Sequence, residues 1–76
     1  MDKQVFLKMI LSSSDEDLIV YAKECNECAS TGIWNTNGKI YSLLLEYAKW
    51  NCGDFVSAME IIINVALEFM KRNAKS

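Results

Sequence analysis

Apolar residues recur along the chain at helical spacing, and start and stop signals divide this pattern into four segments. The first predicted helix runs over about Lys3–Leu11, with Asp2 as its N-cap. A capping box of Ser13 and Glu16 opens the second predicted helix, which runs to about Ala29. The acidic residues that follow the cap favour this helix start, because they face the positive end of the helix dipole.

The second half of the chain predicts two more helices after a loop at residues 32–39, which is rich in turn-forming residues. The third helix is expected over about Lys39–Asn51, and Asp54 is expected to cap a fourth over about Phe55–Asn73. The chain has no proline and no sustained two-residue alternation, which leaves little room for strands. We therefore predict an all-α fold, a small bundle of three to four helices with a hydrophobic C-terminal helix, forming a single helical domain over residues 1–76.

The fourth predicted helix carries more apolar surface than a surface helix needs. At 100° per residue its polar positions occupy about 80° and its apolar positions about 240°, whereas an ordinary surface helix needs an apolar stripe somewhat over about 100° wide. The polar positions are Ser57, Glu60, Asn64, Glu68 and Lys71. Two arrangements are open: the helix is the centre of the bundle, or a second chain covers one of its sides. The third helix repeats the pattern more weakly.

The second predicted helix has a narrower apolar stripe, which includes Cys25 and Cys28. Lys23, Glu24 and Glu27 are interpreted as lying opposite that stripe. We therefore expect an outer helix of the bundle, with both of these glutamates solvated.

Three cysteines raise an alternative, a metal or redox protein that uses Cys25, Cys28 and Cys52 with Asp54 or another chain as the fourth ligand. Cys25 and Cys28 are spaced to point the same way on a helix. A structural zinc site needs four ligands, however, and the chain has no histidine. A redox cysteine would sit at a helix N-terminus, where its pKa falls, and Cys25 is far from one. Packing as small apolar side chains is favoured, and no metal ligand is assigned.

Two large apolar residues, Ile33 and Trp34, lie in the predicted loop. They either fold back over the open end of the bundle or anchor a partner, because tryptophan is enriched where interfaces bind most tightly. Trp50 has the same two interpretations, with core packing favoured. The residues assigned to partner binding are Ile33, Trp34, Trp50, Ile63, Leu67 and Met70.

The composition argues against several kinds of catalytic and cofactor-binding site. The 76 residues include no histidine, which removes the commonest general base and neutral metal ligand, and the three glycines do not form a phosphate-binding loop. We therefore expect no enzyme, no catalytic residue, and no cofactor or cofactor-binding residue. The net charge of -2 and the lack of basic residues from 54 to 70 argue against nucleic acid as a partner. The short link between the last two helices is also typical of a helix-turn-helix, so a helix-turn-helix-like transcriptional regulator is a further alternative.

The apolar N-terminal stretch is interrupted by Lys8 and followed by acidic residues, which is not the pattern of a signal peptide. No apolar run is long enough for a membrane span, and an odd number of cysteines fits a reducing compartment. We expect a soluble cytoplasmic protein with no membrane partner. Its small size and many Asn, Lys and Ile residues are compatible with a phage or mobile-element accessory protein.

The function that the sequence favours is therefore a small non-enzymatic protein-interaction module, a regulator or inhibitor. It would bind another protein through the apolar surface of its C-terminal helices, and we expect it to form a homodimer.

Overall fold

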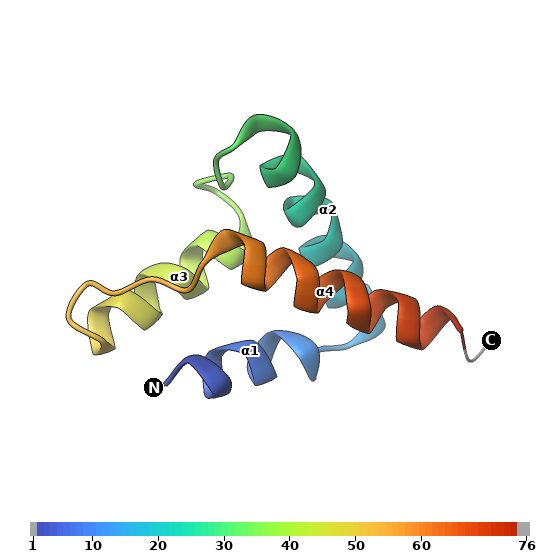
Figure 1. The fold of residues 1–76 in the computed structure, drawn as a ribbon, viewed down its shortest axis with the longest axis horizontal. Coiled ribbons are helices and arrows are strands. Elements are labelled where there is room, and N and C mark those ends of the chain that lie inside the picture. The colour runs from blue at the N-terminus through green and yellow to red at the C-terminus, as the bar shows by residue number, and fades with distance from the viewer. Residues whose placement is uncertain (1, 75–76) are drawn as a thin grey trace.

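The computed structural model describes residues 2–74, which form four helices and no strand within that range (Figure 1). The helices are α1 (Lys3–Leu11), α2 (Asp15–Thr31), α3 (Lys39–Trp50) and α4 (Ala58–Asn73). The predicted all-α bundle is confirmed, and the first three helices lie close to their predicted positions.

The starts of α1 and α2 depend on side-chain caps. Asp2 is the N-cap of α1, as predicted. The N-cap of α2 is Ser14 rather than the predicted Ser13, because the Ser14 hydroxyl accepts the N–H of Asp17 at 3.2 Å. The Ser13 hydroxyl instead donates to the carbonyl of Ile10 at 2.6 Å and closes the end of α1. Neighbouring serines thus serve two adjacent helix ends.

The start of α4 differs more from the prediction. Asp54 does not cap this helix, which begins at Ala58. Cys52 and Gly53 take positive φ values of 55° and 83°, so the chain turns sharply after α3. Residues 54–57 are not helical, and the side chain of Val56 is buried in the core. Burial of Val56 from a non-helical segment explains why the helix begins later than the sequence indicates.

The core lies where α4 crosses α2 and runs beside α1, while α3 packs against α2 (Figure 1). Phe6 of α1 meets Tyr47 of α3 edge to face, with ring centroids 5.4 Å apart, which joins the outer helices. The most deeply buried side chains are Phe6, Ile10, Leu18, Ile40, Ile61 and Val65. Every helix contributes at least one of them, so each helix is held by the shared core.

Arg72 fixes the end of α4 to the junction between α1 and α2. Its guanidinium donates to the carbonyl of Leu11 and to the carboxylates of Asp15 and Glu68, each at 2.9 Å. The carboxylates of Glu68 and Asp15 raise the pKa of Arg72 above its usual value. The helix dipole favours a cation near the C-terminus of α4, and this one also joins distant parts of the chain.

Candidate protein-binding surface

One side of α4 is not covered by the rest of the described chain. Met59, Ile63, Leu67 and Met70 are 65%, 48%, 59% and 64% exposed, and the small side chain of Ala66 is exposed among them. At 100° per residue these five positions span about 100° of the helix surface. We call these five residues the α4 face. The opposite side of the helix holds the core residues, so α4 is packed on one side and open on the other.

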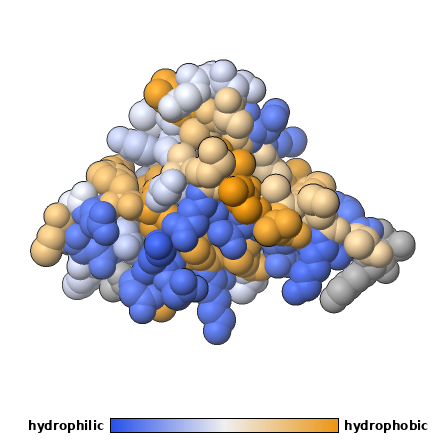
Figure 2. All heavy atoms as spheres, in the orientation of Figure 1, coloured by the Kyte–Doolittle hydropathy of each residue, from blue (hydrophilic) through white to orange (hydrophobic). Residues whose placement is uncertain are grey.

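A shallow apolar groove lies beside the α4 face, between α2 and α4. It has a volume of about 330 Å³ and is lined by Ala22 and Ala29 on α2 and by Ile62, Phe69 and Met70 on α4. Figure 2 shows hydrophobic residues along α4 and between α4 and α2, and hydrophilic residues on the side of α1.

A polar edge borders the α4 face on the side away from the groove. Glu60 lies near the start of this edge and forms an ion pair with Lys3 of α1 at 3.4 Å. Lys71 lies at the other end of the same edge, in the last turn of α4, and is exposed. Glu60 and Lys71 are about 20° apart around the helix axis. The edge therefore carries Glu60, which is paired with Lys3, near one end and Lys71 near the other, while Glu68 of the same polar stripe is paired with Arg72.

The structure divides the residues assigned to partner binding. Ile63, Leu67 and Met70 share the α4 face. Ile33, in the loop after α2, is 72% exposed, whereas Trp34 is half-buried and packs against the core, so the two loop residues separate into one exposed and one packed side chain.

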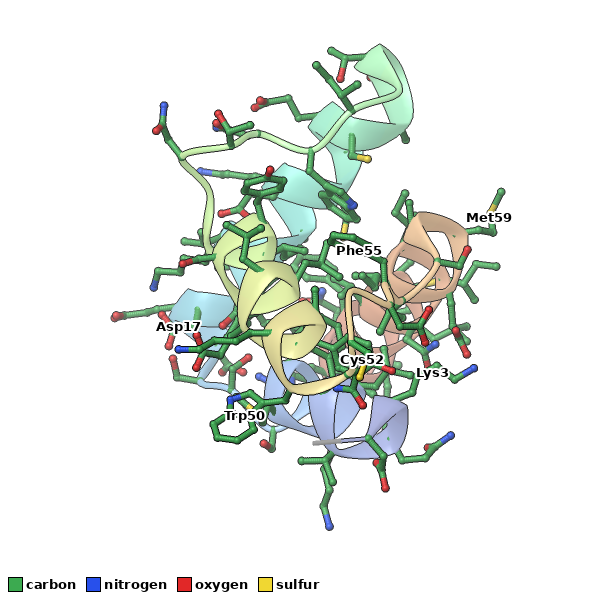
Figure 3. The ribbon with its side chains drawn as sticks, turned by 90° about the vertical axis from the view of Figure 1, so that its left-hand side faces the viewer. Lys3, Asp17, Trp50, Cys52, Phe55 and Met59 are labelled. Atoms are coloured by element: carbon green, nitrogen blue, oxygen red, sulfur yellow. The ribbon has the colours of Figure 1, made fainter. Side chains whose placement is uncertain are left out.

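The favoured interpretation of Trp50 was wrong. Its side chain is 65% exposed and donates to Glu46 at 3.4 Å. The residue ends α3, and the chain turns away there rather than covering it. Trp50 and Met59 project from opposite sides of the molecule in Figure 3, so Trp50 is not part of the α4 face.

Sequence reasoning missed Met59 as a member of this surface. The signal was available, because Met59, Ile63 and Leu67 are spaced by four residues and so lie one above the other on a helix. The apolar arc of about 240° did not show which of its sides the core would cover.

The cysteines are not gathered at one site. Cys25 and Cys28 are buried in α2, and burial, with a smaller contribution from Cys28, raises the pKa of Cys25 to about 12. Burial also raises the pKa of Cys28. Cys52 is exposed in the turn after α3 (Figure 3), and all three thiols are free. Within residues 2–74 no group of three or more His, Cys, Asp or Glu side chains is placed to hold a metal ion.

Glu24 was expected to be solvated, and that expectation was wrong. Its carboxylate is buried and accepts hydrogen bonds from the backbone N–H groups of Lys39 at 3.0 Å and Ile40 at 2.9 Å. On α2 it lies about 40° from Cys28, at the edge of the apolar stripe and not opposite it. The N-cap position of α3 is Gly38, which offers no side-chain acceptor. A glutamate of one helix thus caps the next.

Comparison of the chain with protein-family models, with curated proteins and with solved structures gives no match. Among residues 2–74, none of the helices combines the length and the apolar character needed to cross a membrane. The α4 face, with the groove beside it, is the feature of the described chain from which a function can be argued.

Proposed function

We propose that this protein is a small non-enzymatic interaction module that regulates or inhibits another protein by binding it through the α4 face. The observation that supports this proposal is the set of exposed apolar side chains between Met59 and Met70, which no other described part of the chain covers. Fully burying a side chain of this size is worth roughly 1.5 to 3 kcal/mol. Because its cysteines are free, we place the activity in the reducing cytoplasm.

The shape and charge of the surface favour a protein over other ligands. A helical ridge next to a shallow apolar groove matches the way an amphipathic helix of a partner is held. Binding to a phosphate backbone needs lysine or arginine, and the α4 face carries neither. Helices that lie on anionic lipid have a strongly basic polar side, whereas α4 carries Glu60 and Glu68 beside Lys71 and Arg72.

Affinity capture from cells of the native host tests this proposal. We would compare the wild type with Leu67→Lys, which places a charge on the α4 face, and with Leu45→Lys as a matched control. Leu45 is a similarly exposed leucine on α3, 49% against 59% for Leu67. We expect a protein that is captured by the wild type and by Leu45→Lys and is lost with Leu67→Lys. If every captured protein is retained by Leu67→Lys, the proposal is wrong.

A further inference from the structure

We propose that the occupant of the α4 face is a second copy of this chain, with the two α4 helices antiparallel about a twofold axis that passes between Asn64 and Val65. This inference rests on the proposed function in one respect, that the α4 face is a protein-binding surface, and it names a second copy of the chain as the protein that binds there. Two properties of α4 carry it: the spacing of its apolar residues and the placement of charge along its polar edge.

The apolar residues match one another under this symmetry. An axis between Asn64 and Val65 sets Met59 opposite the partner's Met70 and Ile63 opposite the partner's Ala66. A large side chain therefore meets a small one on either side of the axis, which lets the two helices approach closely. Each contact occurs twice, as in any twofold interface.

The groove gains an occupant in the same arrangement. The partner's Met59 lies opposite Met70, which lines the groove between α2 and α4. An exposed methionine of one copy is thus placed at the edge of an apolar groove of the other.

The charges select the antiparallel direction. In an antiparallel twofold pair the same edge of each helix faces its counterpart, so Glu60 faces the partner's Lys71, and Lys71 faces the partner's Glu60. The two positions differ by about 3 Å along the axis from an exact match, which a lysine side chain spans. In a parallel pair this polar edge would face the groove side of the other copy, and neither charge pair would form.

The size of the surface predicts moderate affinity. α4 has 16 residues and is thus about 24 Å long. One pair of such helices covers less than the about 800 Å² per partner of a standard interface. Contacts at the groove add to the buried area but do not bring it to the standard size. We therefore expect a dissociation constant of about 1 to 100 μM for the dimer.

Sedimentation equilibrium between about 1 and 500 μM tests the arrangement, because this range spans the expected constant. We would measure the wild type, Glu60→Lys, Lys71→Glu and the double variant Glu60→Lys/Lys71→Glu. Each single change sets like charges face to face, and we expect it to weaken the dimer about tenfold. The double variant restores opposite charges and should dimerise like the wild type. A mixture of the single variants should form a heterodimer.

Lys49→Glu is the matched control. Lys49 and Lys71 are both lysines in the last turn of a helix, α3 and α4 respectively, so the two changes disturb the helix dipole alike. We expect Lys49→Glu to leave the dimer unchanged. Circular dichroism of every variant shows whether it is folded. If Glu60→Lys unfolds because it loses the contact with Lys3, the effect of Lys71→Glu on dimerisation decides the test.

Two results overturn the inference. One is a wild type that remains monomeric at about 500 μM, and the other is a dimer that Leu67→Lys disrupts while the charge variants do not. A monomer whose capture of another protein still depends on Leu67 overturns self-pairing and leaves the proposed function standing. A dimer that follows the charge exchange, with no other protein captured through this face, supports self-pairing and overturns the proposed regulatory function.

Discussion

The carboxylate of Glu24, in the middle of α2, caps the N-terminus of α3 through a 2.9 Å hydrogen bond from the backbone N–H of Ile40. The N–H of Lys39 donates to the same carboxylate at 3.0 Å. The first helical N–H groups need an acceptor, and negative charge is favoured at this end of a helix. The contact therefore positions α3 against α2 from a residue 16 positions earlier in the chain.

Glu24→Ala should reduce the free energy of unfolding by about 2 to 3 kcal/mol, because it removes a cap and leaves a buried N–H without its acceptor. Urea unfolding followed by circular dichroism measures the change. Glu27→Ala is the control, since Glu27 is an exposed glutamate one turn further along α2. We expect it to change the free energy by less than about 0.5 kcal/mol. Equal effects of the two substitutions would contradict the capping role.

Gly38→Ala should disturb the same cap from the opposite side. A methyl group at this position would lie 2.7 Å from Oε1 of Glu24 and so would displace the carboxylate. The backbone φ of Gly38 is -85°, which alanine adopts without strain. We expect Gly38→Ala to cost about 1 to 2 kcal/mol in the wild type and much less in the Glu24→Ala background. A double-mutant cycle of unfolding free energies measures this coupling, and additive costs would refute it.

Ile61→Ala and Ile63→Ala should separate the two sides of α4. Ile61 is fully buried, whereas Ile63 is 48% exposed on the α4 face. Ile61→Ala should lower the free energy of unfolding by about 2 to 5 kcal/mol, and Ile63→Ala by less than about 1 kcal/mol, when both are measured at low protein concentration. Thermal or urea unfolding of both variants provides the comparison. Similar losses would mean that Ile63 belongs to the core.

Cys52 should be the reactive thiol of the folded protein. It is exposed, whereas Cys25 and Cys28 are buried and burial raises the pKa of both thiols. Titration with a chromogenic disulfide at neutral pH should find one fast thiol in native protein and all three in denaturant. The variant Cys52→Ser should lose the fast phase. A fast phase that survives this substitution would place a second cysteine at the surface.

Stability should fall at alkaline pH. The unfolded chain releases the Cys25 proton near its ordinary pKa of 9.0, whereas the folded chain retains it up to a pKa of about 12. The contribution of this thiol is therefore complete below pH 9 and is lost as pH rises toward about 12, with a slope of at most about 1.4 kcal/mol per pH unit. Burial, with a smaller effect of Asp17, also raises the pKa of Tyr21, which adds to the loss above pH 10. Unfolding of Cys25→Ala over this range should show a shallower slope than the wild type.

Helix positions followed from local signals in the sequence. Asp2 and the serines before α2 are side-chain acceptors directly ahead of segments with helical spacing of apolar residues, and both helices begin there. Such caps act within three residues of the helix they serve, so a sequence displays them completely. The sequence also indicated the exposed apolar side of α4. The apolar residues of this helix span a wider angle than the other helices can cover from one side.

The features that the sequence did not predict depend on contacts between distant segments. Asp54 has the chemistry of a cap, but the turn at Cys52 and the burial of Val56 move the helix start past it. Glu24 has the chemistry of a solvated residue, and only the return of the chain at Gly38 brings it an N–H partner. A helix that starts at a glycine without a cap is the available hint that another segment supplies one.

The contacts of Arg72 have a consequence for biosynthesis. This side chain, close to the end of the described chain, binds the carbonyl of Leu11 across 61 positions, and α4 supplies the core residues that α1 and α2 surround. While the ribosome is still making α4, the apolar sides of α1 and α2 that α4 covers have nothing to pack against. The bundle therefore closes after translation of its last turns, and a nascent chain stalled before Arg72 should remain sensitive to protease.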